Sequence, residues 1–271
     1  MREAQAGKRE ALLATAALLL SLWIGKHLAS ATGLGDLIFT AIAAFQLYVP
    51  LWLIQRGGEA PESHGIHAHG CLLGPIAALR AFVVRDLWKR RRQHRVRRRS
   101  PLRRLLAHYG RGASFRARPF FEDLGFAVVV AVVTFAPFAV GHHFWQQEVF
   151  HHAFRGFSEP DDLKIMLLKQ TFLIALPEEL FYRGFLEHRL ERVWPTKKTF
   201  LGLPLGRTVV VASFLFALGH FLGEYNPARL GPFFPAFVFS MLVRRSRSIT
   251  GSVMYHGLSN AVSYFLAFGY H

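Results

Sequence analysis

Long apolar runs separated by short basic or polar segments shape the whole chain. Runs of about 17 to 25 mostly apolar residues are long enough to cross the hydrocarbon core of a bilayer as helices. Runs of this kind lie at residues 11–29, 34–55, 121–145, 163–183, 207–223, 229–243 and 249–270. The pattern therefore predicts an all-α fold, a polytopic membrane helical bundle of about seven to eight transmembrane helices.

The eighth helix depends on a shorter apolar run at 71–84, which contains Arg80. A run of this length fits either a transmembrane helix or a helix that lies at the membrane interface. If it lies at the interface, the N-terminal arm and the very basic loop 85–118 fall on the same side of the membrane, as the positive-inside rule requires. We therefore expect an interfacial helix at 71–84.

The distribution of Lys and Arg also predicts the orientation. Threading the helices from a cytoplasmic N-terminus places the basic segments 85–118, 188–207 and 244–247 in the cytoplasm and the acidic loop 146–162 outside. The first apolar run is interpreted as an uncleaved span, because no clear small-residue cleavage site ends it. We predict an integral membrane protein with its N-terminus and polybasic loop in the cytoplasm. Because arginine outnumbers lysine, a bacterial inner (plasma) membrane is favoured.

Composition narrows the class of protein further. Hydrophobic residues make up 52% of the 271 residues, yet the formal net charge is +16, and the charges are segregated from the apolar runs, which argues against a soluble domain. The single Cys71 excludes an internal disulfide and a zinc-binding cysteine cluster. The densest basic stretch, 88–99, has no aromatic platform or nucleic-acid fold beside it, so we predict anionic lipid as its partner and no nucleic acid.

The apolar run at 163–183 ends in an unusual group of charged residues, Glu178, Glu179 and Arg183. An ionisable side chain deep in a bilayer costs at least roughly 2.5 kcal/mol, so such residues usually face a packed interior and carry function. Glu179 and Arg183 are four residues apart, which is the favourable spacing for an ion pair on one helix face. Glu178 is then left without a local cation, and it is the carboxylate available as a general base.

Two later apolar runs each contribute a histidine. His256 and Asn260 are four residues apart, so one helix face presents a ring nitrogen and an amide that can both donate hydrogen bonds. His220 lies on a separate helix and approaches the acidic pair only through tertiary packing. Pro177 removes a backbone hydrogen bond beside the acidic pair and makes room for water. A lone histidine or asparagine in a membrane often bonds a neighbouring helix, but together these groups predict one polar site.

The ordered set of motifs resembles the CPBP or Abi family of intramembrane glutamic endopeptidases, which includes CAAX prenyl endopeptidases of the Rce1 type. The motifs are Glu-Glu-x-x-x-Arg at Glu178, Glu179 and Arg183, Phe-x-x-x-His at Phe216 and His220, and His-x-x-x-Asn at His256 and Asn260. The resemblance covers about residues 165–265 and departs at Ser240, where a glycine is expected. It implies that 120–271 is a CPBP-like catalytic helical bundle, whereas 1–119 holds N-terminal membrane helices with the polybasic cytoplasmic loop.

The resemblance implies a metal-independent peptidase without a cofactor. By that analogy Glu178, with help from His220, would activate the water that attacks the peptide bond, while His256 and Asn260 would stabilise the oxyanion. Glu179 would support the site together with Arg183. The substrate would be a membrane-associated protein or peptide of the CAAX type, the bacteriocin type or the type with a C-terminal sorting signal.

Two other interpretations stay open. A zinc-dependent membrane peptidase would use Glu178, His220 and His256 as ligands, although the chain has no His-Glu-x-x-His helix. A non-catalytic membrane immunity or transport protein would also bury Glu and His, although paired halves are not evident in the sequence. A further group of histidines in a polar loop is expected to be solvated rather than to bind metal: His64, His67 and His69.

Overall fold

A computed structural model describes residues 2–66, 117–157, 162–197, 199 and 202–270. The predicted interfacial run 71–84, the polybasic stretch 88–99, His67 and His69 lie outside the described residues. In chain order the helical elements are α1 (Arg2–Thr32), α2 (Gly35–Arg56), η1 (Pro61–His64), α5 (Ala117–Glu148), α6 (Leu163–Leu168), η3 (Lys169–Ala175), α7 (Leu176–Glu179), η4 (Leu180–Glu187), α8 (His188–Val193), α9 (Arg207–Glu224), η5 (Pro227–Leu230), α10 (Phe233–Ser246) and α11 (Thr250–Phe268).

The predicted all-α membrane bundle is confirmed. Each of the seven long apolar runs corresponds to a helix, and within the described residues the elements form seven long helical segments when α6 to α8 are counted as one. Four of the helices are long and apolar enough to cross a membrane by themselves: residues 4–32, 35–56, 117–148 and 207–224. The last-but-one helix begins later than the apolar run 229–243, because the short 3₁₀ helix η5 and Pro232 precede it.

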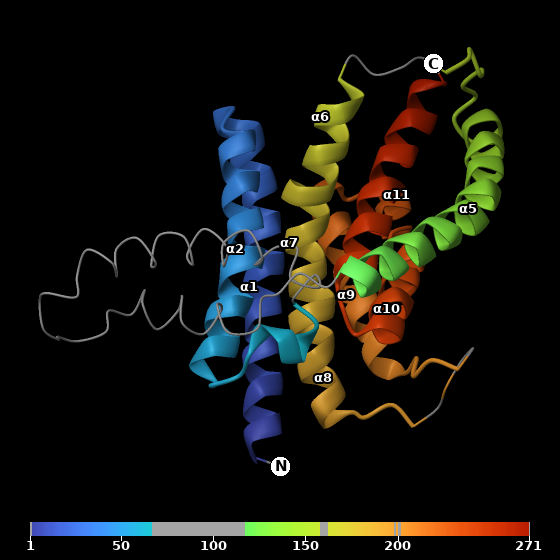
Figure 1. The fold of residues 1–271 in the computed structure, drawn as a ribbon. Helices are drawn as coiled ribbons and strands as arrows, with labels where there is room; N and C mark the ends of the chain where they lie inside the picture. The colour runs from blue at the N-terminus through green and yellow to red at the C-terminus, as the bar shows by residue number, and fades with distance from the viewer. Residues whose placement is uncertain (1, 67–116, 158–161, 198, 200–201, 271) are drawn as a thin grey trace, which may run out of the picture.

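The bundle is assembled around the continuous helix that runs from α6 to α8 (Figure 1). Helix α1 packs against α2, α8 and α9, while α11 packs against α5, η3 and α10. The N-terminal helices and the later helices therefore share contacts, and the division of the chain at residue 119 stays a prediction. The end of the bundle at which α1 begins and both α2 and α8 end is called the α8 end.

Two π-helical segments, η3 and η4, flank the short α7 that carries the acidic pair. The N–H of Leu176, the residue before Pro177, donates to the carbonyl of Thr171, five residues earlier, instead of the usual four. Pro177 itself has no N–H to donate, so the wider turn lies directly before the residue that interrupts the α-helical ladder. The predicted break thus takes the form of π-helical turns, which frequently occur at functional sites.

The outer surface of the bundle suits lipid. Helix α5 exposes large apolar side chains such as Val129, Val132 and Val133, which are 59–69% exposed. By contrast, the interior beside the acidic pair is aromatic, and the rings of Phe181, Phe216 and Phe239 are 0–2% exposed. A bundle that is apolar on both its outside and its inside leaves only the clustered polar side chains to carry chemistry.

Candidate functional site

Glu179 is the hub of the buried polar cluster. Its Oε1 lies 3.1 Å from Nη1 of Arg183, and both side chains are fully buried. The ion pair predicted from their spacing is therefore present. Nδ1 of His256 lies 3.0 Å from the same oxygen, and the hydroxyl of Ser252 donates to Oε2. Both oxygens of the carboxylate are thus occupied by partners from α7–η4 and α11.

Glu178 has a different environment from its neighbour. Its side chain is 18% exposed, and its Oε2 lies 3.6 Å from Nε2 of His256. That distance is longer than a normal hydrogen bond, and within the described residues this buried oxygen has no hydrogen-bond partner. Glu179 therefore fixes one nitrogen of His256, while the other nitrogen faces Glu178. The structure brings these two predicted residues together from helices that are distant in sequence.

His220 approaches the cluster through an aromatic side chain. Its Nδ1 lies 3.0 Å from the carbonyl oxygen of Phe216, so Nδ1 donates to the backbone and Nε2 is left free to accept. The Phe216 ring lies 4.6 Å from the His220 ring and 5.7 Å, edge to face, from the His256 ring. His220 and Asn260 are both partly exposed, in contrast to His256, which is buried. Asn260 follows His256 by one turn of α11.

Arg183 is held by groups on several helices. Its guanidinium carbon lies 4.5 Å from the ring centre of Phe216 and 4.8 Å from that of Phe239, within the range of cation–π attraction. Its Nη2 donates to the carbonyl of Ala236 at 3.3 Å. The Phe239 ring also stacks on His256 at 4.4 Å. The cation that neutralises Glu179 is therefore positioned by α9 and α10.

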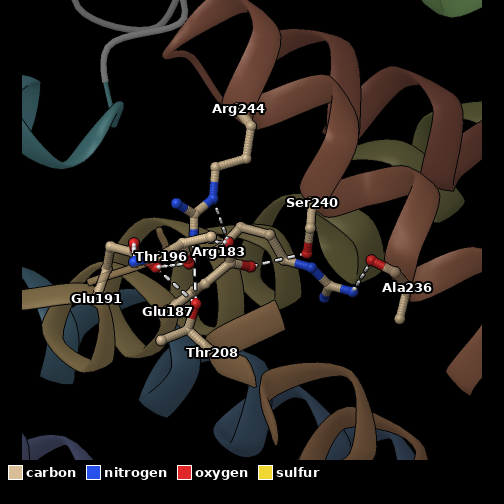
Figure 2. Close-up of polar contacts among 8 residues, drawn as sticks. All are labelled: Arg183, Glu187, Glu191, Thr196, Thr208, Ala236, Ser240 and Arg244. Carbon is tan, nitrogen blue, oxygen red and sulfur yellow. Dashed lines mark hydrogen bonds and ion pairs between the residues drawn. The ribbon is translucent and has the colours of Figure 1, made fainter. Parts of the chain in front are cut away.

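The acidic pair is the first part of a longer polar ladder, which Figure 2 shows from Arg183 onward. On the central helix, charged residues recur every four positions, and on α10 the partners do the same, so one face of each helix meets the other. The rungs are Arg183 Nη2 to Ala236 O at 3.3 Å, Ser240 Oγ to Glu187 Oε2 at 2.7 Å and Arg244 Nη2 to Glu191 Oε2 at 2.8 Å. This ladder fixes the register of α10 on the helix that carries Glu178 and Glu179.

The departure from the expected glycine at Ser240 has a structural explanation. Ser240 is fully buried, and its hydroxyl donates to the buried carboxylate of Glu187, which also accepts from Nε of Arg244 at 2.8 Å. A glycine could not supply this hydrogen bond. Glu187, Ser252 and Arg244 were not singled out from the sequence, although the four-residue spacing of Glu179, Arg183 and Glu187 is a signal that could have identified the ladder.

The prediction that His64 is solvated is wrong. We expected it to be solvated in a polar loop, but it is 3% exposed, and its Nδ1 lies 3.1 Å from the carbonyl oxygen of Gly184. The carbonyl of Gly65, directly after η1, also accepts from the N–H of Ile249 at 3.0 Å, so this segment is held to the start of α11 as well as to the central helix. Local polarity did not reveal this, because the burial arises from contacts with residues more than a hundred positions later.

The fold and the buried cluster together define the class: a helical membrane protein with a Glu–Glu–Arg centre and histidines drawn in from other helices. A protein-family model described as type II CAAX prenyl endopeptidase Rce1-like matches residues 160–262. Residues 160–262 are therefore similar to the Rce1-like type II CAAX prenyl endopeptidases, as the resemblance of the motifs predicted. No curated protein and no solved structure matches the chain.

Proposed function

We propose that this protein is an intramembrane endopeptidase in which Glu178 activates a water molecule for attack on a peptide bond. The observation that carries the proposal is the contrast between two adjacent carboxylates. Glu179 is fully buried and bonded to Arg183, Ser252 and His256, whereas Glu178 is partly exposed and uncommitted. A general base needs a carboxylate that is free to accept a proton, and Glu178 is the one that meets this need.

The histidines fit complementary roles. His220, with Nδ1 committed to a backbone carbonyl, presents Nε2 as an acceptor that orients the attacking water beside Glu178. Nδ1 of His256 donates to the carboxylate of Glu179, which holds the ring with Nε2 directed toward Glu178. In the oxyanion role Nε2 would have to carry a proton as well, and the Asn260 amide would be the second donor.

The peptide substrate enters from the membrane. The bulky apolar faces of the helices suit a membrane-associated protein or peptide, and the Rce1-like domain supports a CAAX-type, bacteriocin-type or C-terminal sorting-signal substrate. The charge pattern supports a cytoplasmic α8 end, which carries many basic side chains. Anionic lipid is the proposed partner of the basic loop.

The geometry favours this mechanism over zinc at the same residues. Within the described part of the chain, the three potential ligands that come within 4.8 Å of one another are Glu59, His64 and His188, not Glu178 with His220 and His256. Glu178 and His256 instead face each other at 3.6 Å, with the second nitrogen of His256 already bonded to Glu179.

The proposal is tested by comparing host membranes that carry wild-type protein or Glu178→Gln. Glutamine nearly preserves the shape of the side chain and removes the base, so peptide termini that appear with wild type should be lost in Glu178→Gln. The same termini should remain with Glu148→Gln, the control at an exposed position. In a reconstituted assay on a substrate so identified, His256→Ala or Asn260→Ala should each reduce turnover roughly a hundredfold or more. New termini that persist in Glu178→Gln would overturn the proposal.

A further inference from the structure

A second, partly buried cluster lies at the α8 end of the bundle, apart from Glu178. It is formed by Glu59, in the turn after α2, His64 of η1 and His188, the first residue of α8. One ligand atom from each lies within 4.8 Å of the others. His188 is ten residues beyond Glu178 on the same continuous helix, which corresponds to about 15 Å at 1.5 Å per residue. The cluster is therefore separate from the proposed catalytic site.

The protonation pattern of His64 leaves a bare acceptor facing another acceptor. Both ring nitrogens of His64 face groups that can only accept: Nδ1 lies 3.1 Å from the Gly184 carbonyl oxygen, and Nε2 lies 3.0 Å from Oε2 of Glu59. A neutral histidine carries one ring proton, so one of the two nitrogens faces an acceptor with its lone pair, and this nitrogen is Nε2 when Nδ1 donates to the backbone. Two acceptors at this distance repel each other unless a cation lies between them. A backbone carbonyl bonded to the second ring nitrogen is also the usual outer support of a metal-binding histidine.

His188 adds an unpartnered nitrogen to the same place. Its ring centre lies 4.0 Å from that of His64, and its Nε2 is buried without a hydrogen-bond partner in the described part of the chain. A buried polar atom without a partner is unfavourable, so it points to a ligand. From these observations we propose that Glu59, His64 and His188 bind a divalent transition metal ion, with zinc as the best match for two imidazoles and a carboxylate.

Two arginines shape the affinity of this site. Nη1 of Arg189 lies 2.6 Å from Oε1 of Glu59 and orients the carboxylate from its far oxygen. Nη2 of Arg192 lies 2.6 Å from Oε2, the oxygen that faces His64, and its side chain is 43% exposed. Arg192 therefore competes with the metal for Oε2 and has to swing into solvent when the ion binds. Ligands at zinc distances of about 2.1 Å lie roughly 3.4 Å apart. The His64–Glu59 pair, at 3.0 Å, would therefore open slightly, whereas a pair near the 4.8 Å limit would close by about 1.4 Å.

The site would be structural rather than catalytic. Residues of η1 connect α2 to the segment that comes after it, and their ligation to α8 would fix this connection against the helix that also carries the acidic pair. This proposal does not depend on peptide cleavage, because it is tested by measuring the metal content and the stability of the protein. A chelator that removed this ion would lower the stability of the protein, but it would leave every group of the proposed mechanism in place.

The test uses full-length protein in detergent, stripped with a chelator and then titrated with Zn²⁺ or Co²⁺. We expect about one equivalent of zinc per chain, a raised unfolding temperature and, with cobalt, visible absorption bands of a low-symmetry nitrogen and oxygen site. His64→Ala and His188→Ala should each lose the metal, whereas the exposed His152→Ala and the catalytic-site Glu178→Gln should retain it.

Arg192→Gln tests the site through its zinc affinity while all three proposed ligands are kept. Without the competing guanidinium, zinc affinity should rise roughly tenfold or more, because one like charge leaves the site. Failure of stripped wild-type protein to bind zinc at micromolar concentration would overturn the proposal. Unchanged affinity in Arg192→Gln, or metal retained by both histidine variants, would also overturn it. Metal lost in Glu178→Gln would instead assign the ion to the proposed catalytic residues.

Discussion

At the scale of single residues, each charge of the buried Glu179–Arg183 pair is stabilised by several partners. Oε1 of Glu179 lies near both Arg183 and His256, while Arg183 is covered by the faces of Phe216 and Phe239. A buried ion pair of this kind contributes little net stability relative to an apolar pair, but breaking it leaves one charge without compensation. The acidic pair therefore consists of Glu179, which is bound into the structure, and Glu178, the proposed base, whose Oε2 has no hydrogen-bond partner among the described residues.

This division predicts different consequences for two substitutions. Arg183→Ala leaves Glu179 buried without its cation and should lower the free energy of unfolding by about 3 to 5 kcal/mol. Glu178→Gln removes a partly exposed carboxylate that has no described hydrogen bond at Oε2, and it should change stability by less than about 1 kcal/mol. Denaturant unfolding in detergent micelles measures both. Equal stability of the two variants would show that Arg183 does not anchor Glu179.

At the scale of helices, close packing on the π-helical segment positions α11 and hence His256. A Cβ on Gly257 would lie 2.5 Å from Oγ1 and 3.0 Å from the backbone Cα of Thr171 in η3. The backbone contact cannot be relieved by a rotamer change, so only a glycine allows α11 to approach this closely. The wide turn before Pro177 and the small residue on α11 are therefore complementary parts of one contact.

Gly257→Ala should force α11 away from η3. We expect a loss of about 1 to 3 kcal/mol in stability, typical of overpacking, together with reduced activity because His256 is one residue away. The matched control is Gly125→Ala in α5, where an added Cβ meets nothing within 4 Å and helix propensity favours alanine by up to about 1 kcal/mol. Thermal unfolding of both variants checks this. A neutral Gly257→Ala variant would contradict the close contact.

The polar ladder predicts a pH dependence at the α8 end of the bundle. Burial raises the pKa of Glu191, but hydrogen bonds from Arg244, Thr208 and Thr196 outweigh it and lower the pKa from 4.5 to about 2. Because the folded value lies below the unfolded value, ionised Glu191 stabilises the fold fully above pH 4.5. This contribution is lost as the pH falls from 4.5 toward 2.

Unfolding temperatures measured across this pH range should fall less steeply in Glu191→Gln than in wild type. Glu191→Gln should also be less stable at neutral pH, because it lacks the charged acceptor for Arg244. Glu148→Gln removes an exposed carboxylate at the end of α5 and serves as the control for a lost negative charge. Identical slopes in wild type and Glu191→Gln would show that the ladder does not hold Glu191 in its ionised form.

Much of this element-level architecture could be predicted from the sequence. Apolar runs identified the helices, and four-residue spacing identified the Glu179–Arg183 pair, because both depend on local periodicity. The contacts of Ser252 with Glu179 and of His64 with Gly184 could not be predicted, since they join segments far apart in the chain and leave no local pattern. The π-helical segments were foreseen only as a break at Pro177.

At the scale of the whole molecule, the two ends of the bundle differ in the charged side chains that they carry. The α8 end carries Arg56, Arg192, Lys197 and Arg207, whereas the opposite end includes Glu148 and the turn after α5. Such an asymmetry orients a membrane protein with its basic end in the cytoplasm. In the proposed function, a substrate would then reach Glu178 on the central helix from the lipid phase, with its soluble part on the side of the α8 end.

The orientation can be measured with single cysteines in a Cys71→Ser background. Lys197→Cys reports on the exposed segment that follows α8, and Ala153→Cys reports on the exposed segment beyond α5 at the opposite end. A membrane-impermeant maleimide should label Ala153→Cys in intact cells and Lys197→Cys only after the membrane is opened or in inverted vesicles. The positive-inside rule gives this result because moving the basic end outward would carry its arginines and lysines across the bilayer. Labelling of Lys197→Cys in intact cells would reverse the orientation and, with it, the side from which the soluble part of a substrate approaches Glu178.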